Sequence, residues 1–325
     1  MVSVLLTGAT GQDGSYLAER LAQREWEIHA VVRSMDEAAD EQPLLTGVHR
    51  VVADLSTPSE IAEAIASIRP DVIVNLAGIS SVAESWAQPE RVAIVNGVAV
   101  GAMLEAAWKV SSAGQQSVRF IQASSAELFG RTKDDPQTEL TSICPSSPYG
   151  ASKAFAHHLV GVYRARGLAA SSAILYNHES PRRPLSFVTR KITHGVAAIA
   201  AGRATSLELG SLEARRDWGW APDYVDALMR MIDAEGADDY IVATGETHSV
   251  EQFVEAAFLS VGIADWQSYV TFNPEWVRPV DAPSLRGDST KIQRELGWTP
   301  TLRFEDIVSE MVKHDLTLEG LRSEP

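Results

Sequence analysis

Cysteine is almost absent from this chain of 325 residues, where Cys144 is the only one. A single thiol excludes an internal disulfide framework and a structural zinc site built on cysteine. Basic residues are also few, because 28 lysines and arginines stand against 43 aspartates and glutamates and leave a formal net charge of −15. That balance argues against a protein that binds the nucleic-acid backbone. We expect neither a nucleic-acid partner nor a metal site.

Long apolar runs are lacking at the start of the chain. The run Met1–Leu6 has no basic flank and is too short for a signal sequence or a membrane span, so we expect a cytoplasmic protein without membrane contact. Hydrophobic residues make up 45% and charged residues 22%, which is ordinary for a globular enzyme. The length suits one large domain or two unequal ones.

Strands and helices are predicted to alternate through the first half of the chain. Continuous β-rich runs predict buried strands, and apolar residues at helical spacing predict helices. Strands are expected at Val2–Thr7, Ile28–Val32, Val51–Val52, Val72–Asn75 and Phe120–Ala123, and helices at Gln12–Gln23, Ile61–Ile68, Val92–Val110 and Ser147–Arg164. This alternation indicates an α/β fold with a Rossmann-type doubly wound parallel sheet.

The pattern changes after Tyr176, where Glu179–Pro184 breaks regular structure. Helices are expected later at Phe187–Ala200, Asp223–Ala234, Val250–Val261, Ser289–Leu296 and Phe304–Asp315, with a strand at Asp239–Ala243. We expect a smaller C-terminal α/β lobe that binds substrate across a cleft. The predicted division is a cofactor-binding domain of residues 1–177 plus about 215–245, and a lobe of about 178–214 and 246–325.

Three glycines, Gly8, Gly11 and Gly14, follow the first predicted strand and open the first predicted helix. In that position the first permits the turn, the second lets backbone approach a pyrophosphate, and the third lets helix and strand pack closely. The alternative is an ordinary strand-to-helix turn. We interpret the loop as a dinucleotide site.

The residues that follow two further predicted strands indicate which dinucleotide is bound. Arg33 follows the second strand, where an acidic residue would favour NAD, and its guanidinium could pair with the 2′-phosphate of NADP. Asp54 and Leu55 follow the third strand, where side chains commonly contact adenine. The alternatives are a solvated arginine and a structural turn aspartate. NADP is therefore expected, with NAD the less favoured cofactor.

Tyr149 and Lys153 are separated by one helical turn and lie on the same helix face. A nearby ammonium favours phenolate over phenol, so Lys153 is expected to prepare Tyr149 as a base. Ser125 and Glu127 follow a strand at the sheet edge where such folds build their sites. Ser125 could hold a substrate oxygen, and Glu127 could remove a proton made acidic by a ketone. The alternatives are a buried helix tyrosine and a charge at a helix start.

The chain resembles known families in several runs. Thr7–Gly14, Asn75–Ala77, Ser124–Glu127 and Tyr149–Lys153 resemble the extended short-chain dehydrogenases. Longer runs resemble the GDP-mannose 4,6-dehydratase family: Asn177–Arg183 with Phe187–Thr193, Arg216–Gly219 with Asp223–Val225, and Arg278–Pro279 with Gly287–Asp288. The similarity covers nearly the whole chain.

The resemblance implies a lyase that converts GDP-mannose to GDP-4-keto-6-deoxymannose. Tyr149 would take the C4 hydroxyl proton while hydride passes to NADP. Glu127 would take the C5 proton, and Glu127 or Ser125 would protonate the departing C6 oxygen. Hydride then returns to C6, so the cofactor is unchanged overall.

The resemblance also implies two sets of binding residues. Those for the cofactor are Gly8, Thr10, Gly11, Gln12, Asp13, Gly14, Arg33, Asp54, Leu55, Leu76, Ala77, Tyr149, Lys153 and His178. Those for the substrate are Ser80, Ser85, Ser125, Asn177, Glu179, Val188, Lys191, Gly210, Arg216, Arg278 and Asp281.

Several positions depart from the family pattern. Ser125 replaces a threonine, Ala126 a serine, Pro184–Leu185 a Gly-Glu pair, Ser211 an asparagine and Asp281 a glutamate. An acidic stretch containing Asp36, Glu37, Asp40 and Glu41 replaces a longer basic loop that binds NADP across a tetramer interface in the family. We therefore expect a homodimer through Val92–Val110 and Ser147–Arg164, with a homotetramer as the alternative.

Three other functions compete with this one. A nucleotide-sugar 4-epimerase or 4-ketoreductase would share the fold, but Glu127 beside Ser125 argues against it. A dehydratase of another nucleotide diphosphate-hexose would share the chemistry. A non-catalytic nucleotide-sugar or NADP-binding protein would not need Tyr149 and Lys153, and both are present.

Overall fold

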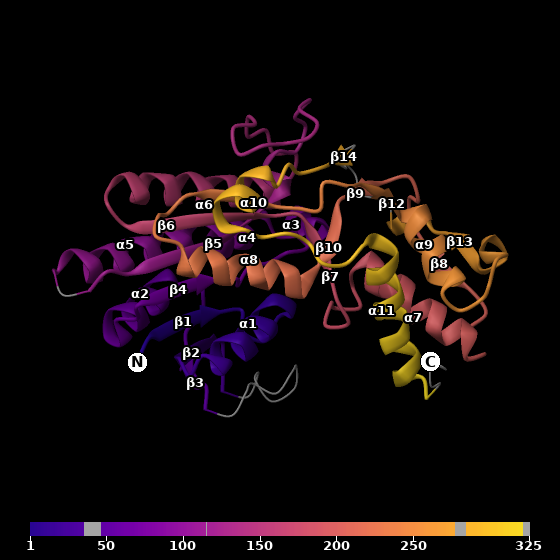
Figure 1. The fold of residues 1–325 in the computed structure, drawn as a ribbon, viewed down its shortest axis with the longest axis horizontal. Coiled ribbons are helices and arrows are strands. Elements are labelled where there is room, and N and C mark those ends of the chain that lie inside the picture. The colour runs from indigo at the N-terminus through magenta and orange to yellow at the C-terminus, as the bar shows by residue number, and fades with distance from the viewer. Residues whose placement is uncertain (36–46, 115, 277–283, 321–325) are drawn as a thin grey trace.

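The fold is known from a computed structural model that describes residues 1–35, 47–114, 116–276 and 284–320. Seven parallel strands form one sheet in the order β11-β6-β5-β4-β1-β2-β3 (Figure 1). The strands are β1 (Ser3–Thr7), β2 (Glu27–Val32), β3 (His49–Val52), β4 (Val72–Asn75), β5 (Arg119–Ser125), β6 (Ala169–Leu175) and β11 (Asp239–Val242). Six of them have the Rossmann order, and β11 extends the sheet beyond β6.

Helices cover both faces of the sheet. On one face lie α1 (Gln12–Gln23) and α8 (Ala221–Asp233), whose apolar residues form one core cluster with alternate residues of the strands. On the other lie α2 (Pro58–Ile68), α5 (Ala99–Ser112) and α6 (Pro148–Ala165), which form a second cluster. Strands buried on both faces need apolar residues on both, which explains the continuous apolar run in β1.

The predicted elements are confirmed with small changes at their ends, and α1 and β4 have the expected bounds. The doubly wound parallel sheet is also confirmed. In the seven-stranded sheet, the strand that was not predicted is β6, which lies second from one edge, between β5 and β11. The short strands outside this sheet were not predicted either. The predicted helix at residues 92–110 is part of a longer stretch.

That longer stretch runs over Pro89–Ser112 and contains α4 (Pro89–Ala93), a π-helical turn (Ile94–Val98) and α5. By length and composition it could cross a membrane, but half of its most apolar window is buried inside the fold. Helix α5 packs against α2 and α6 as part of the core. Its apolar composition is thus accounted for by packing within the protein.

A separate hydrophobic cluster is formed by elements that lie beyond the carboxyl ends of the strands, at the right of Figure 1. It contains α7 (Val188–Ala200), β8 (Leu207–Leu209), α9 (Val250–Leu259) and α11 (Phe304–Leu318). Strand β13 (Val270–Phe272) pairs in parallel with β8. Ile292 and Trp298, from the same part of the chain, pack instead in the cluster beside α8. The division into two domains stays a prediction.

The remaining elements of the described residues are short. They are α3 (Val82–Ala87), β7 (Asn177–Glu179), β9 (Arg215–Arg216), β10 (Trp218–Trp220), β12 (His248–Ser249), β14 (Ser284–Leu285), α10 (Thr290–Leu296), and the 3-10 turns η3 (Ala126–Leu128), η4 (Trp266–Tyr269) and η5 (Pro274–Trp276). β7 pairs with β10, and β9 lies between β12 and β14.

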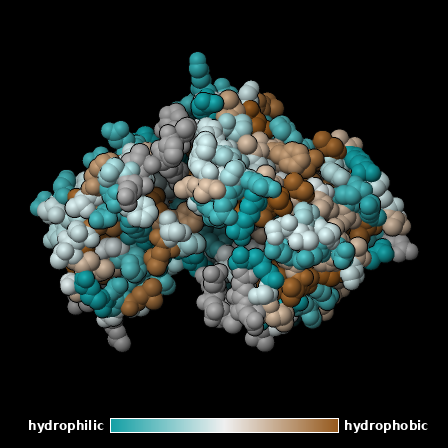
Figure 2. Space-filling model, turned by 180° about the vertical axis from the view of Figure 1, so that it is seen from behind, coloured by the Kyte–Doolittle hydropathy of each residue, from teal (hydrophilic) through white to brown (hydrophobic). Residues whose placement is uncertain are grey.

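The face of the molecule opposite to that seen in Figure 1 is hollowed near its centre, and residues around the hollow are hydrophilic (Figure 2).

Candidate active site

The glycine loop between β1 and α1 brings backbone close to anything bound there. Gly8 has φ +70°, and a Cβ on it would lie 2.8 Å from the backbone nitrogen of Ala77. A Cβ on Gly14 would lie 2.0 Å from the Gly8 carbonyl oxygen, so α1 can pack on the loop only with glycine there. Gly11 is the N-cap of α1 and has no side chain to cap its first turn. This arrangement suits a phosphate group.

The start of α1 is tied to the segment that follows β6. His178 Nε2 lies 2.9 Å from Asp13 Oδ2, and its Nδ1 lies 2.7 Å from the Tyr176 carbonyl oxygen. Gln12 Nε2 donates to the His178 carbonyl at 3.1 Å, and its Oε1 accepts from Ser180 Oγ at 2.9 Å. Burial opposes both charges, yet the ion pair raises the pKa of His178 and lowers that of Asp13. The predicted cofactor residues Gln12, Asp13 and His178 therefore form one cluster.

The four predicted catalytic residues meet at the carboxyl end of β5. Ser125 is the last residue of that strand, and Glu127 lies in the following turn η3. Tyr149 and Lys153 lie in the first turns of α6, which Ser147 caps by accepting a hydrogen bond from Gly150 N at 3.0 Å. A Cβ on Gly150 would lie 2.5 Å from the Glu127 carbonyl oxygen. Glycine at that position therefore lets α6 approach η3.

The pKa of Tyr149 is shifted in the direction opposite to the one that the sequence predicted. Burial raises the pKa of Tyr149 to about 12, and the negative charge of Glu127 adds to this effect. A hydrogen bond with Ser125 and the charge of Arg183 act in the opposite direction. The prediction that Lys153 lowers this pKa is wrong for this structure, because the Lys153 ammonium lies 5.9 Å from the Tyr149 ring centroid and donates to the Ala123 carbonyl at 2.9 Å. Burial lowers the pKa of Lys153 to about 8.

Asn96 was not singled out in the sequence, yet it shapes the loop after β4. It lies in the π-helical turn, and its side chain accepts from Ile79 N at 2.9 Å and donates to Ile79 O at 3.0 Å. A Cβ on Gly78 would lie 2.9 Å from Asn96 Oδ1 and 3.7 Å from Lys153 Nζ. Asn96 thus fixes the loop that faces Lys153. No sequence motif marks this residue, and π-turns often occur at functional sites.

The other predicted cofactor residues lie at the same edge of the sheet, because the ends of parallel strands meet there. Leu76 and Ala77 follow β4, and Ala77 N donates to Thr7 Oγ1 at 3.0 Å. Hydrogen bonds from Ser56 lower the pKa of Asp54, and the positive charge of Arg33 lowers it further. Arg33 and Asp54 therefore lie near each other. Leu55 is packed in the core, which leaves only its backbone for a ligand. Thr10 lies in the glycine loop.

The predicted substrate residues of the lobe are spread over several elements. Asn177 pairs with Trp218 in the β7–β10 ladder, and Arg216 lies in β9. Glu179 is fully buried, and its carboxylate accepts from Thr189 Oγ1 at 2.6 Å. The remaining three lie elsewhere in the lobe: Val188 begins α7, Lys191 lies one turn further, and Gly210 follows β8.

Two predicted substrate serines lie around α3. Ser80 is exposed before the helix, whereas Ser85 is fully buried and donates to the Val82 carbonyl at 2.6 Å. The Ser85 hydroxyl is therefore used inside its own helix. The predictions for Arg278 and Asp281, and the acidic stretch with Asp36, Glu37, Asp40 and Glu41, lie outside the described residues.

Arg183 is a site residue that the sequence marks only as one member of a longer run. Its Nε lies 3.3 Å from Glu179 Oε2, and its guanidinium lies over the Phe187 ring at 3.7 Å. Its charge acts on the pKa values of Tyr149, Asp13 and His178. The charge of one guanidinium therefore acts on the pKa of Tyr149 and on the pKa values of the Asp13–His178 pair.

Asp217 follows Arg216 in the chain and is buried among hydrogen-bond donors. Its carboxylate accepts from Thr244 N at 2.9 Å, Thr244 Oγ1 at 2.6 Å, Gly245 N at 2.8 Å and Gly287 N at 3.4 Å. Burial raises the pKa of Asp217 to about 6. The side chain joins the loops after β11 and β14 to the strand that carries Arg216.

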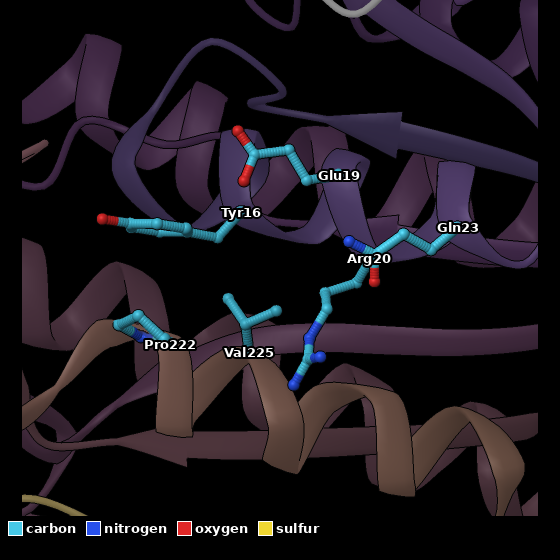
Figure 3. Close-up of a pocket in the computed structure, with 6 residues that line it drawn as sticks. All are labelled: Tyr16, Glu19, Arg20, Gln23, Pro222 and Val225. Atoms are coloured by element: carbon cyan, nitrogen blue, oxygen red, sulfur yellow. The ribbon is translucent and has the colours of Figure 1, made fainter.

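A small open pocket of about 190 Å³ lies between α1 and α8 (Figure 3). Its lining residues are Tyr16, Glu19, Arg20, Gln23, Pro222 and Val225. None of them is a predicted site residue. Arg182, from the segment after β7, lies over the Tyr16 ring at 3.8 Å and also pairs with Glu19 at 2.5 Å. These two contacts hold the side chains of the pocket wall in place.

A glycine loop at β1, a serine at the end of β5 and a Tyr-x-x-x-Lys pair in α6 define a class of proteins. These features, on a doubly wound sheet with a C-terminal lobe, are those of the extended short-chain dehydrogenases and reductases. A family model described as GDP-mannose 4,6 dehydratase matches residues 5–311. The chain belongs to the GDP-mannose 4,6-dehydratase family.

Two relatives illustrate how far the similarity extends. The chain is 42% identical over 327 residues to GDP-mannose 4,6 dehydratase 2 of Arabidopsis thaliana, covering 97% of this chain and 87% of the relative. It is 38% identical over 349 residues to the GDP-mannose 4,6 dehydratase of Homo sapiens, covering 99% and 92%. The similarity therefore includes both parts of the chain.

Solved structures with less than 25% identity confirm the fold. UDP-glucose 4-epimerase of Thermotoga maritima, with UDP-glucose, has a TM-score of 0.85 at 22% identity, covering 98% of this chain and 99% of the other. UDP-glucose 4-epimerase of Thermus thermophilus, with NAD, has 0.83 at 24%, covering 97% and 99%. RMD of Pseudomonas aeruginosa, with NADPH, has 0.78 at 22%, covering 98% and 100%.

Proposed function

We propose that this protein dehydrates GDP-mannose to GDP-4-keto-6-deoxymannose by internal hydride transfer from C4 to C6. Membership of the GDP-mannose 4,6-dehydratase family supports this assignment along nearly the whole chain. The observation that carries it is the meeting of Ser125, Glu127 and Tyr149 at one strand end, where the carboxylate charge reaches the phenol. An epimerase needs the phenol and the serine but has no step for such a carboxylate.

The glycine loop fits a nicotinamide dinucleotide. Backbone at Gly8 and Gly14 leaves no room for side chains, and Gly11 opens α1 towards a phosphate. Lys153 and Tyr149 lie one helical turn apart beside the loop after β4, where they would hold the nicotinamide end. A nicotinamide dinucleotide held there would supply the hydride transfer that links C4 to C6. We infer NADP rather than NAD from Arg33, whose charge lies near Asp54 at the adenosine end.

The protein's own residues would carry out four proton transfers. Tyr149 removes the proton of the C4 hydroxyl, and the Ser125 hydrogen bond and the Arg183 charge favour its phenolate. Glu127 then takes the C5 proton, which the C4 ketone makes acidic. The leaving C6 hydroxyl receives a proton from Glu127 or Ser125 and departs as water. A proton returned to C5 completes the product.

Homodimer formation is part of the proposal. Phe155 and Val162 of α6 are 51% and 59% exposed, and Val98, just before α5, is 49% exposed. Phe155 also packs on Gly97, where a Cβ would lie 2.9 Å from its ring. These apolar side chains belong to the two segments from which the dimer was predicted, and burying them between two copies would remove them from water.

A panel of nucleotide sugars tests the assignment. We expect GDP-mannose to lose one water without net change of NADPH, as read by mass spectrometry and absorbance. GDP-mannose that carries deuterium at C4 should yield product with the label on its C6 methyl group. Label lost to solvent would contradict internal transfer. Turnover of UDP-glucose or dTDP-glucose in place of GDP-mannose would show that the substrate is wrong.

Arg33→Ala tests the choice between the two cofactors. An arginine–phosphate hydrogen bond contributes about 1.5–3 kcal/mol, so NADP affinity should fall about 10- to 100-fold while NAD affinity changes little. Affinities can be measured by calorimetry. Arg50→Ala, an exposed arginine on the neighbouring strand β3, is the matched control. Equal losses for NADP and NAD in Arg33→Ala would exclude a role of Arg33 at the 2′-phosphate.

A further inference from the structure

His178 is a buried histidine whose two ring nitrogens both face oxygen atoms. Nδ1 lies 2.7 Å from the carbonyl oxygen of Tyr176, and Nε2 lies 2.9 Å from Oδ2 of Asp13. A carbonyl oxygen can only accept a hydrogen bond, so Nδ1 must carry a hydrogen. Nε2 needs a second hydrogen, because a neutral ring would turn a lone pair towards the carboxylate. The two contacts therefore require one proton more than a neutral imidazole facing an ionised Asp13 supplies.

The surroundings of Asp13 show that this proton is on the ring and not on the carboxyl group. Gln12 Nε2 donates to the other oxygen of Asp13, Oδ1, at 3.1 Å. Burial opposes ionisation of Asp13, but the charge of His178 and the hydrogen bonds from His178 and Gln12 outweigh it and lower the pKa of Asp13. The pair is therefore an imidazolium beside a carboxylate.

The other groups packed against His178 allow it to stay charged. The Tyr224 ring of α8 stacks on the imidazole at 4.4 Å, and burial raises the pKa of this phenol, so it stays neutral. An aromatic face attracts a cation. Arg183 opposes a second positive charge, but its guanidinium pairs with Glu179 at 3.3 Å. Burial lowers the pKa of His178, and the charge and hydrogen bond of Asp13 raise it by more.

This ion pair lies at the end of α1 that opens towards the dinucleotide phosphates. Asp13 is the second residue of α1, directly after the first turn begins at the N-cap Gly11. A carboxylate in that turn repels a pyrophosphate that the same turn attracts. The charge of His178 offsets this repulsion. The charge of Arg183, the other cation that acts on Asp13, is already matched by Glu179.

We propose that His178 is a positioning residue whose imidazolium charge offsets the Asp13 carboxylate, so that the protein binds a dinucleotide tightly only while His178 keeps its proton. The inference rests on the proposed function for the identity of the ligand, a nicotinamide dinucleotide at the glycine loop. His178 acts on that ligand through Asp13. By reciprocity, a bound dinucleotide should make His178 hold its proton more strongly.

NADP affinity should then depend on pH with a definite sign. As pH rises, His178 loses its proton and leaves the Asp13 carboxylate uncompensated, so the affinity should fall. Lys153, with a pKa of about 8, loses its own charge in the same range. Asp13→Asn keeps Lys153 but has no carboxylate to offset. Between about pH 6.5 and 10 the wild type should therefore lose about tenfold more NADP affinity than Asp13→Asn, measured by calorimetry.

A double-mutant cycle at neutral pH gives the sharper test. His178→Gln leaves Asp13 charged and should weaken NADP by about tenfold or more. Adding Asp13→Asn removes the unpaired charge and should restore most of this affinity. A histidine needed only for packing would not be rescued in this way. As a control, Asp233→Asn removes an exposed carboxylate that pairs with Arg24 at the far end of α1, and it should rescue nothing in His178→Gln.

NMR of the histidine ring nitrogens tests the protonation without cofactor, and it does not depend on the folding of His178→Gln. The ring whose signal changes in Asp13→Asn should have both nitrogens protonated in the wild type at neutral pH. A neutral His178 ring, a double variant as weak as His178→Gln, or an unchanged pH dependence in Asp13→Asn would each overturn the proposal. A wild type that binds NADP with these properties but does not convert GDP-mannose would overturn the proposed function alone. A wild type that binds no dinucleotide would overturn both.

Discussion

Replacing Glu127 by glutamine is expected to reduce GDP-mannose dehydration by about 10²- to 10⁴-fold, the usual loss when a general acid–base group is removed. Glutamine keeps the size of the side chain but cannot take the C5 proton. The first step should survive, because removing the Glu127 charge lowers rather than raises the pKa of Tyr149. The variant should therefore form a product that has lost two hydrogens from C4 and O4 but no water.

Mass spectrometry of the bound sugar distinguishes these species. In D₂O the wild type should place deuterium at C5 of its product, whereas Glu127→Gln should show no exchange there. Glu310→Gln, on the surface of α11, is a control with the same chemical change. Cofactor affinity should be unchanged in both variants. Unchanged turnover in Glu127→Gln would remove this carboxylate from the mechanism.

Lys153→Met is expected to abolish activity and yet make the protein more stable at neutral pH. Burial lowers the pKa of Lys153 from 10.5 to about 8, so the folded state holds its charge at a cost. At about 1.36 kcal/mol per pKa unit, that cost is about 3 kcal/mol below pH 8. Methionine has a similar shape and no charge. We expect Tm at pH 7 to rise by a few degrees, measured by calorimetry.

The pH dependence gives the sharper test. Between pH 8 and 10.5 the unfolded lysine binds a proton that the folded one has released, so wild-type stability from this group rises with pH. The advantage of Lys153→Met should therefore be largest below pH 8 and shrink as pH rises to 10.5. Lys313→Met, an exposed lysine of α11, should show no such trend. A constant difference across this range would mean that only packing had changed.

The sheet could largely be predicted from the sequence because its signals are local. β1 and β4 are continuous apolar strands, and the glycine loop marks the start of α1. β6 was missed because its sequence, Ala-Ala-Ser-Ser-Ala-Ile-Leu, has small residues with weak β propensity. Its place between β5 and β11 is decided by tertiary pairing. Ser171 Oγ also accepts from Asp238 N at 3.2 Å, an interaction across the chain that no local pattern reveals.

The site was predictable in its residue types but not in its electrostatics. The spacing of Tyr149 and Lys153 placed both on one face of α6, as observed. Burial is the largest cause of the raised pKa of Tyr149, and the charges of Glu127 and Arg183 act on it in opposite directions. Neither the burial nor the approach of Arg183, which comes from a distant segment, can be read from local spacing. Asn96 was missed because its role depends on a helical irregularity, and such irregularities leave no pattern in a single sequence. Long-range geometry accounts for both failures.

The π-helical turn has a consequence for how this chain can change length. Removing one residue from Ile94–Val98 to restore an ordinary helix would rotate α5 by about 100° relative to α4. Either the hydrogen bond between Asn96 and Ile79 would be lost, or Gly97 would no longer lie against the Phe155 ring. Insertions and deletions in homologous chains should therefore avoid this turn and accumulate in surface loops, even though nothing in the composition of the helix shows that its residue count matters.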